Sequence, residues 1–442
     1  MRFLKYLLVG GFLLAGFGAF AQSGIVTSVP EIAGIRVEFI LFALTLVGVA
    51  LFHNQTLKVA LSGLSAILVF KFAFDPSFHL GEHIFGNNSI ITQILHKDAR
   101  QGEWVILLNL LGLLVGFSVL AKIFEDSGVP DYLPKWLPND WKGPFVLLLM
   151  ILVLSSFLDN IAAAMIGGAI ALVVFKNRVH IGYVAAIVAA SNAGGAGSVV
   201  GDTTTTMMWI DGVRALDVTH AYVASFAAFI VFSLFASFQQ DKYQRIQKDP
   251  VENLKIDFGR LAIVGGILLC TITTNVLFDF PALGVWVAIV VGSFVRKCPW
   301  GEAKHALGGS VFLLSLVTAA SLMPVDELPL ASWQTSLSLG FISAVFDNIP
   351  LTKLALEQGG YDWGVLAYSV GFGGSMIWFG SSAGVAITTK FPEARSVGKW
   401  LKLGWHVTVS YIIGFFVMLM LVGWHPHAPH KNVQTPAKIV SE

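Results

Sequence analysis

The stretch Ser155-Ser156-Phe157-Leu158-Asp159-Asn160-Ile161 lies in the middle of an apolar run from Pro144 to Phe175. A carboxylate at the centre of a bilayer costs about 2.5–3.5 kcal/mol on insertion scales, so it persists only where it faces protein or water. The same S-x-x-x-D-N-I phrase returns as Ser343-Ala344-Val345-Phe346-Asp347-Asn348-Ile349. Two such interrupted apolar runs predict a duplicated membrane protein with its functional site at the interruptions.

The composition agrees with a membrane protein. Of the 442 residues, 55% are hydrophobic and only 12% are charged, whereas soluble proteins are about 25% charged. A net charge of +1 gives no electrostatic support to a nucleic-acid partner. The two cysteines are Cys270 in an apolar span and Cys298 in a basic loop. We therefore expect neither a disulfide framework nor a cysteine metal site.

The N-terminus has the pattern of a signal peptide. Arg2 and Lys5 precede an apolar run from Tyr6 to Phe20, and Ala19-Phe20-Ala21 follows a small-residue cleavage pattern. We therefore expect residues 1–21 to be a signal peptide that is cut after Ala21. The alternative is an uncleaved first helix.

Apolar runs elsewhere predict about ten spanning helices, some of them short for the roughly 20 residues that a crossing needs. These runs are 37–52, 57–74, 104–121, 181–210, 220–238, 260–278, 281–295, 309–323, 363–388 and 401–423. The segments 144–175 and 334–358 are interrupted by the Asp-Asn pairs. Each is either a single crossing or a re-entrant hairpin that returns to its own side.

The distribution of basic residues favours the hairpins. With two hairpins and the mature N-terminus outside, the cytoplasmic loops hold eighteen Lys and Arg residues and the outer loops six. With two single crossings only nine remain inside. Because Lys and Arg concentrate in cytoplasmic loops, the first hairpin enters from the cytoplasm and the second from outside. The two halves are therefore predicted to be inverted repeats.

This topology predicts the division of the chain, with the mature N-terminus and the C-terminus both outside a bacterial inner membrane. The predicted parts are the first transmembrane repeat (37–238), a cytoplasmic linker (239–259), the second transmembrane repeat (260–423) and an external tail (424–442).

A second shared phrase follows each hairpin. It spans Gly197 to Thr206 in the first half and Gly374 to Ser382 in the second, where two more residues precede the last glycine. Glycines followed by hydroxyl residues in the middle of a span predict a broken helix. Its freed carbonyl and N–H groups can face a solute near the midplane.

The aspartates at these breaks have two possible roles. Asp159 and Asp347 could cap the second helix of each hairpin, because Asp is favoured at that position, and capping does not exclude ion binding. Asp202 is followed by Thr203 to Thr206 rather than by an apolar helix. Carboxylate, hydroxyl and carbonyl oxygens suit a hard cation, and a buried carboxyl group also binds a proton readily. Competition between the two is the minimum requirement for antiport.

Two nearby polar residues leave alternatives open. Asn192, within Ser191-Asn192-Ala193-Gly194-Gly195, could close a helix or donate an oxygen to a solute. Lys353 could extend its ammonium group to the membrane interface or pair with Asp347.

At these residues the chain resembles a known family. Leu158-Asp159-Asn160, Gly201-Asp202-Thr203-Thr204-Thr205-Thr206-Met207-Met208-Trp209-Ile210 and Phe346-Asp347-Asn348 resemble NhaD-type sodium/proton antiporters. These belong to the ion transporter superfamily, which also contains arsenite and citrate or dicarboxylate carriers. The resemblance covers about 37–423. It implies an all-α polytopic membrane protein with inverted repeats, about ten spanning helices, two re-entrant hairpins and two broken helices, assembled as a homodimer in membrane lipid.

The resemblance also implies a function and a site. It implies sodium (or lithium) and protons as the transported ions, no cofactor, and a sodium site at Asp202, Thr204, Thr205 and Asp159. Thr203 departs from the family pattern, where we expect an apolar residue. The ion- or substrate-binding residues implied in this way are Asp159, Asn160, Asn192, Asp202, Thr204, Thr205, Ser343, Asp347, Asn348, Ser381 and Ser382.

The alternative within the same superfamily is a carrier of citrate, dicarboxylate or arsenite. Three acidic residues at the breaks disfavour an anion unless sodium neutralises them. The S-N-T and T-P-P phrases associated with dicarboxylate carriers are missing from the breaks. An enzyme is not expected, because the sequence has no nucleophile–base pair, nucleotide loop or His/Cys ligand set.

Overall fold

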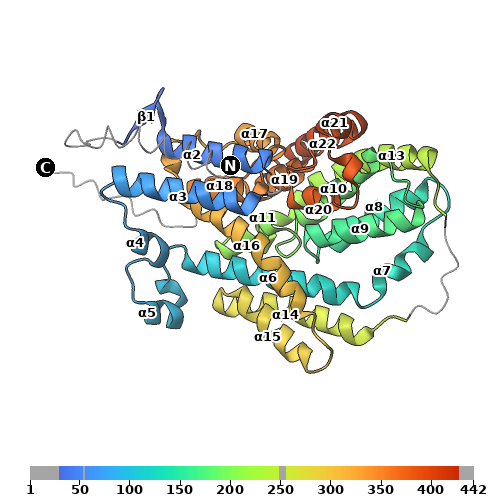
Figure 1. Cartoon of the computed structure of the whole chain (residues 1–442), viewed down its shortest axis with the longest axis horizontal. Helices are drawn as coiled ribbons and strands as arrows, with labels where there is room; N and C mark the ends of the chain where they lie inside the picture. The colour runs from blue at the N-terminus through green and yellow to red at the C-terminus, as the bar shows by residue number, and fades with distance from the viewer. Residues whose placement is uncertain (1–28, 53–54, 248–254, 428–442) are drawn as a thin grey trace, which may run out of the picture.

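The computed structural model describes residues 29–52, 55–247 and 255–427 (Figure 1). The predicted signal peptide, most of the predicted external tail and the middle of the predicted linker lie outside the described residues. The described part is helical apart from one antiparallel pair of two-residue strands, β1 (Glu31–Ile32) and β2 (Ile35–Arg36).

The longer helices of the first half follow the predicted apolar runs, whereas four short ones lie outside those runs. They are α2 (Val37–Leu51), α3 (Thr56–Phe74), α4 (Leu80–Phe85), α5 (Ile90–Leu95), α6 (Trp104–Glu125), α7 (Val129–Tyr132), α8 (Lys142–Ser155), α9 (Asn160–Val174), α10 (Ile181–Gly195), α11 (Thr203–Ile210), α12 (Ala215–Thr219) and α13 (Ala221–Tyr243).

The second half repeats much of this order. Its helices are α14 (Phe258–Phe278), α15 (Pro281–Ser293), α16 (Trp300–Ser321), α17 (Trp333–Ser343), α18 (Asn348–Gln358), α19 (Trp363–Gly373), α20 (Ser382–Ile387), α21 (Val397–Leu403) and α22 (Trp405–Leu421).

Several of the described helices have the length and apolar composition of membrane spans. Five such segments are α3, α6, α14, α16 and the segment Ala215–Tyr243, which combines α12 and α13. The pair α21 and α22, bent by 62°, would make a sixth. Shorter apolar helices, among them α8, α9 and α10, accompany them. The protein is therefore an all-α polytopic membrane protein, and the count of about ten spans stays a prediction.

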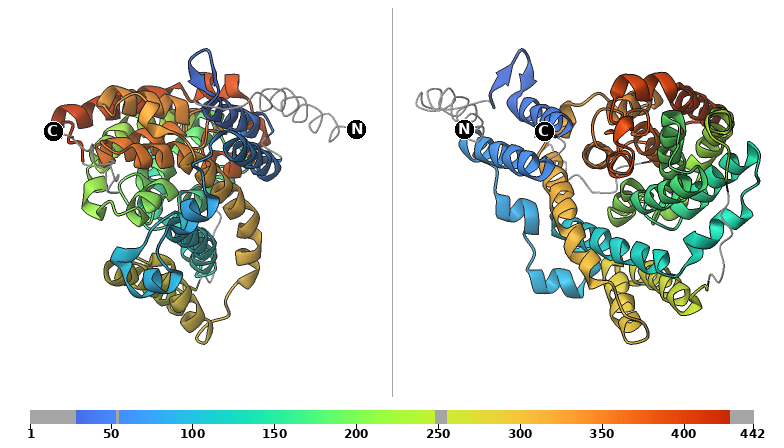
Figure 2. Two further views of the ribbon diagram at one scale, coloured as in Figure 1. Left: turned by 90° about the vertical axis from the view of Figure 1, so that its left-hand side faces the viewer. Right: turned by 45° about the vertical axis from the view of Figure 1, so that its right-hand side comes forward.

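The two halves are built from the same series of parts. Each has two packed helices (α2–α3 and α14–α15), then a long helix (α6 and α16), then two interrupted pairs and a final long helix. The halves also exchange contacts, because α6 packs on α15 and α16 packs on α3. In Figure 2 these outer helices lie to one side of a bundle that contains the interrupted pairs of both halves.

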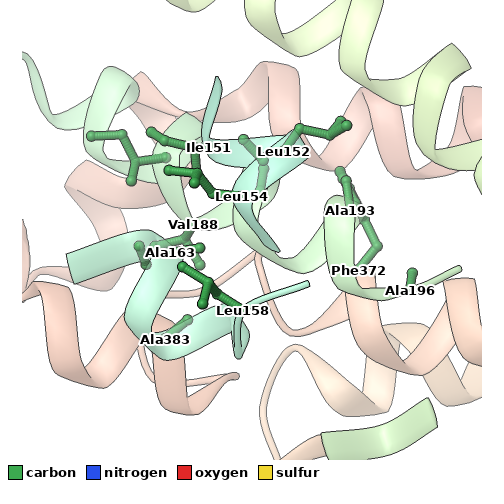
Figure 3. Close-up of a cluster of buried hydrophobic side chains, with 14 of the residues drawn as sticks. Ile151, Leu152, Leu154, Leu158, Ala163, Val188, Ala193, Ala196, Phe372 and Ala383 are labelled. Carbon is green, nitrogen blue, oxygen red and sulfur yellow. The ribbon is translucent and has the colours of Figure 1, made fainter. Parts of the chain in front are cut away.

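Small residues bring the interrupted helices together. Ala163 of α9, Ala193 of α10 and Ala383 of α20 are fully buried in the apolar cluster of Figure 3. Small side chains let helix backbones approach closely, which is how membrane helices gain packing contacts without a hydrophobic driving force between them. This packing holds the breaks of the two halves next to each other.

Candidate functional site

Asp159 and Asp347 are the N-caps of α9 and α18, the second helices of the first interrupted pair in each half. Asp159 Oδ2 accepts a hydrogen bond of 3.2 Å from the backbone N–H of Ile161, and Asp347 Oδ1 accepts one of 3.1 Å from Ile349. Ser382 Oγ, at the start of α20, donates to Asp347 Oδ2 at 3.2 Å. The capping role considered from the sequence is therefore present in both halves.

Asp202 is placed differently. It stands at the N-cap position of α11, yet its side chain makes no capping hydrogen bond, and only 2% of the residue is exposed. Asn160 Nδ2 instead donates to Asp202 Oδ1 at 2.8 Å and to Asn192 Oδ1 at 3.0 Å. The carboxylate is thus held by a neutral amide from the neighbouring break.

Asn192 joins the two halves of the protein. It lies inside α10, so it does not close that helix, and its Nδ2 donates to Ser375 Oγ at 2.9 Å and to Ser381 Oγ at 3.2 Å. Ser381 also caps α20 by accepting the backbone N–H of Gly384 at 3.3 Å. Ser375 was not among the expected site residues, although it follows Gly374 at the start of the second shared phrase.

The threonines after Asp202 have different tasks. Thr205 Oγ1 donates to the carbonyl oxygens of Ser198 at 2.5 Å and Asp202 at 3.0 Å, and so ties the broken segment together. Thr204 Oγ1 lies near the Asp202 carboxylate but, like Asp202 Oδ2, is buried without a hydrogen bond of good geometry among the described residues. Buried polar atoms are normally hydrogen-bonded. These two oxygens are therefore candidates for contact with a ligand.

This difference predicts unlike effects of two similar substitutions. If the protein exchanges sodium for protons, as the resemblance implies, Thr204→Ala should raise the sodium concentration for half-maximal exchange about three- to tenfold and leave the maximal rate near that of the wild type, because one uncharged ligand is lost. Thr205→Ala should instead lower thermal stability, since about 0.5–1.5 kcal/mol of hydrogen bonding is removed from the break. Ion titration of exchange and thermal unfolding of the purified variants measure the two effects. A loss of thermal stability in Thr204→Ala together with a loss of apparent sodium affinity in Thr205→Ala would contradict this division of roles.

Two other predicted residues are buried in the second half. Ser343 Oγ donates to the carbonyl oxygen of Val370 at 2.7 Å, which fastens α17 to α19. Asn348 begins α18 and is 4% exposed. Neither lines the cavity described below, so Ser343 acts in this conformation as a packing contact.

Lys353 corrects both alternatives drawn from the sequence. Its side chain is fully buried, and it forms an ion pair of 2.6 Å with Glu103 at the start of α6 and a second one with Glu357. It therefore neither reaches the membrane interface nor pairs with Asp347. Glu103 lies 250 positions away in sequence.

A cavity of about 1170 Å³ reaches the breaks. Asp159, Asp202, Asp347 and Ser382 line its inner part, whereas Asn160, Asn192, Thr204, Thr205 and Ser381 do not line it. Its polar residues nearer the loops are Lys122, Glu125, Asp126, Asp131, Lys135, Gln247, Glu302, His305, Thr389 and Lys390. All of these belong to, or directly adjoin, segments that the basic-residue count assigns to the cytoplasm.

The three aspartates lie near enough for the charges of Asp159 and Asp347 to act on Asp202. Among the described residues, no group of three or more His, Cys, Asp and Glu side chains is arranged to hold a metal ion. A cation at the breaks would therefore need hydroxyl and carbonyl oxygens as well as carboxylate oxygens. Asp347 already accepts a hydrogen bond from the Ser382 hydroxyl, whereas the Thr204 hydroxyl near Asp202 makes no hydrogen bond of good geometry among the described residues.

Comparison with known proteins agrees with the resemblance in the motifs. Residues 35–373 match the model of a family described as citrate transporter. Sodium/proton antiporter 1 of Arabidopsis thaliana is 29% identical over 78% of this chain and 66% of its own length. The Na⁺/H⁺ antiporters NhaD of Alkalimonas amylolytica and Vibrio parahaemolyticus are 27% and 26% identical, over 53% and 63% of this chain and 60% and 81% of their own lengths. The chain thus spans less than two thirds of the first two relatives.

The family match covers well over half of the chain, including α2 to α19 with both Asp-Asn breaks and the Gly201–Ile210 phrase. The NhaD relatives confirm the NhaD-type resemblance within the ion transporter superfamily. The protein therefore belongs to the citrate transporter family.

Proposed function

We propose that the protein is a secondary active transporter that exchanges cytoplasmic sodium or lithium for external protons. The observation that carries this proposal is Asp202, a buried carboxylate that lines the cavity and has one oxygen without a hydrogen bond of good geometry among the described residues. The names of the NhaD relatives support the same activity.

Asp202 meets two requirements of an exchanger. A cation that leaves water near the midplane needs several oxygen ligands, and it must also be released when a proton arrives. A single carboxylate held by the neutral amide of Asn160 can carry either a proton or a sodium ion. Two ionised carboxylates at the same point would hold the cation too tightly to release it.

The charge of the cavity favours a cation over an anion. Seven acidic side chains line it, against three lysines and one histidine. The lysines (Lys122, Lys135 and Lys390) lie near the loops, whereas the acidic residues at the inner end are Asp159, Asp202 and Asp347. Such a distribution raises the local concentration of cations and repels anions.

The description of the family as citrate transporter supports a second candidate, a carrier of citrate, dicarboxylate or arsenite. In that case the hydroxyls of Ser381 and Ser382 would contact the anion, and sodium would first have to neutralise the aspartates. One assay separates the two candidates.

The test is dequenching of a pH-sensitive dye in energised everted vesicles that contain the protein. NaCl or LiCl should release the acid gradient, because sodium entering the vesicle exchanges for a proton leaving it. Choline chloride and choline citrate should have no effect. A response to sodium citrate that depends on Ser381, with none to NaCl alone, would support the anion carrier instead, because that carrier needs sodium together with the anion.

We further propose a homodimer in the bacterial inner membrane with both termini of the mature chain outside, from the resemblance and the basic-residue count. The orientation can be measured in a variant whose two cysteines are replaced by serine. Cysteines placed at Gln247, beside the cavity, and at the exposed Leu330 should react with an impermeant thiol reagent from opposite sides. Labelling of both from one side would contradict the two-hairpin topology.

A further inference from the structure

The break between α10 and α11 and the break between α19 and α20 are equivalent position by position, and the structure gives their alignment. Ser155 Oγ donates to the carbonyl oxygen of Ser191 at 2.5 Å, and the equivalent Ser343 Oγ donates to that of Val370 at 2.7 Å. Eleven residues after these carbonyls stand the N-cap residues of α11 and α20, Asp202 and Ser381. Aligning Gly197 with Gly374, as the sequence suggests, gives the second phrase two extra residues. The structural alignment corrects this, because the accepting carbonyl and the N-cap residue are equally far apart in both halves.

The alignment makes Asn192 and Gly371 equivalent, since each follows one of the two accepting residues. Asn192 reaches across to the other half, where its amide contacts the N-cap hydroxyl of Ser381. The reciprocal contact would run from residue 371 to Asp202. Gly371 has no side chain to make it, and within the part of the chain that the structure describes Asp202 Oδ2 makes no hydrogen bond of good geometry.

Packing does not require a glycine at position 371. A Cβ placed there would lie 3.4 Å from Asp202 Oδ2 and 3.9 Å from the Cβ of Ala196, which are ordinary contacts. At Gly373, two residues further along α19, a Cβ would collide with the backbone of Gly340. Glycine also weakens a helix interior relative to alanine. The absence of a side chain at Gly371 therefore needs a reason other than helix packing.

We propose that Gly371 is a specificity-determining residue, whose missing side chain keeps the space beside Asp202 Oδ2 open for a cation. The inference rests on the proposed function and adds the residue that limits the size of the ion. Asn192 closes the equivalent position of the second half against Ser381. The pseudo-symmetric breaks are thereby made unequal, with the cation bound at the Asp202 side.

The test replaces Gly371 by alanine. One methyl group should narrow the space beside Asp202 and raise the sodium concentration for half-maximal exchange about tenfold, the size of effect that one carbon atom has in a fitted pocket. The smaller lithium ion should be affected less, so the preference for lithium over sodium should increase by about threefold or more. Exchange is measured by dye dequenching against titrated NaCl and LiCl in everted vesicles.

Gly266→Ala on α14 is the matched control. A Cβ at that position meets no atom within 4 Å, so both half-maximal concentrations should equal those of the wild type. Unchanged values for Gly371→Ala, or an equal rise for both ions, would overturn the inference, because general damage does not select by ion size. A wild-type protein that exchanges neither ion would instead overturn the proposed function, and the inference with it.

Discussion

Replacement of Asp202 by asparagine is expected to abolish sodium/proton exchange. The amide keeps the shape of the side chain, but it can neither bind a proton reversibly nor neutralise a sodium ion. Loss of one member of a buried charge pair costs about 2–5 kcal/mol, so sodium affinity should fall at least about thirtyfold. Dye dequenching by NaCl in everted vesicles should then be indistinguishable from that of vesicles without the protein.

Two further variants separate loss of the ion site from loss of the fold. Asp202→Glu keeps a titratable carboxyl group and should retain some exchange with a shifted pH profile. Asp326→Asn removes an exposed carboxylate from the loop after α16 and should behave as the wild type. If Asp202→Asn exchanged sodium at the wild-type rate, the site would have to be moved, with Asp347 the next candidate because it lines the same cavity.

The sequence was sufficient to locate the helices and the breaks, because both depend on local composition. The apolar runs predicted most of the helices that occur in the structure, and the two Asp-Asn pairs lie between helices as expected. It also distinguished Asp202 from the other aspartates. The absence of an apolar helix after Asp202 suggested that it was not needed as a cap, and its side chain makes no capping hydrogen bond.

Contacts between the halves could not be predicted in the same way. Asn192 meets Ser375 and Ser381, which lie more than 180 residues further along the chain, and no local pattern indicates that pairing. Gly371 was missed for a related reason. A glycine in an apolar helix carries no chemical signal until its equivalence to Asn192 is known from three dimensions.

Lys353 shows most clearly that the sequence does not reveal contacts between distant parts of the chain. The sequence suggests the membrane interface or the nearby Asp347 as the surroundings of its ammonium group. Its partner in the structure, Glu103, belongs instead to the other half of the chain. Both side chains are almost completely excluded from solvent. An ion pair in such a position is not necessarily stabilising compared with an apolar pair, but the loss of one partner leaves an uncompensated buried charge.

Lys353→Met is therefore expected to destabilise the protein strongly. It leaves Glu103 and Glu357 without the cation that contacts both, and breaking a buried pair in this way costs about 3–5 kcal/mol. The temperature at which the detergent-solubilised protein loses its monodisperse chromatographic peak should fall by several degrees. The double variant Lys353→Met/Glu103→Gln should recover much of this loss, because the neutral amide at position 103 removes the negative charge that Lys353 balanced. Lys97→Met, which removes an exposed lysine from its 3.0 Å pair with Asp279, is the control and should change stability by less than about 1 kcal/mol. Equal thermal stability of Lys353→Met and Lys97→Met would show that the carboxylates reach water or carry protons, and that the buried pair is not what holds α18 to the start of α6.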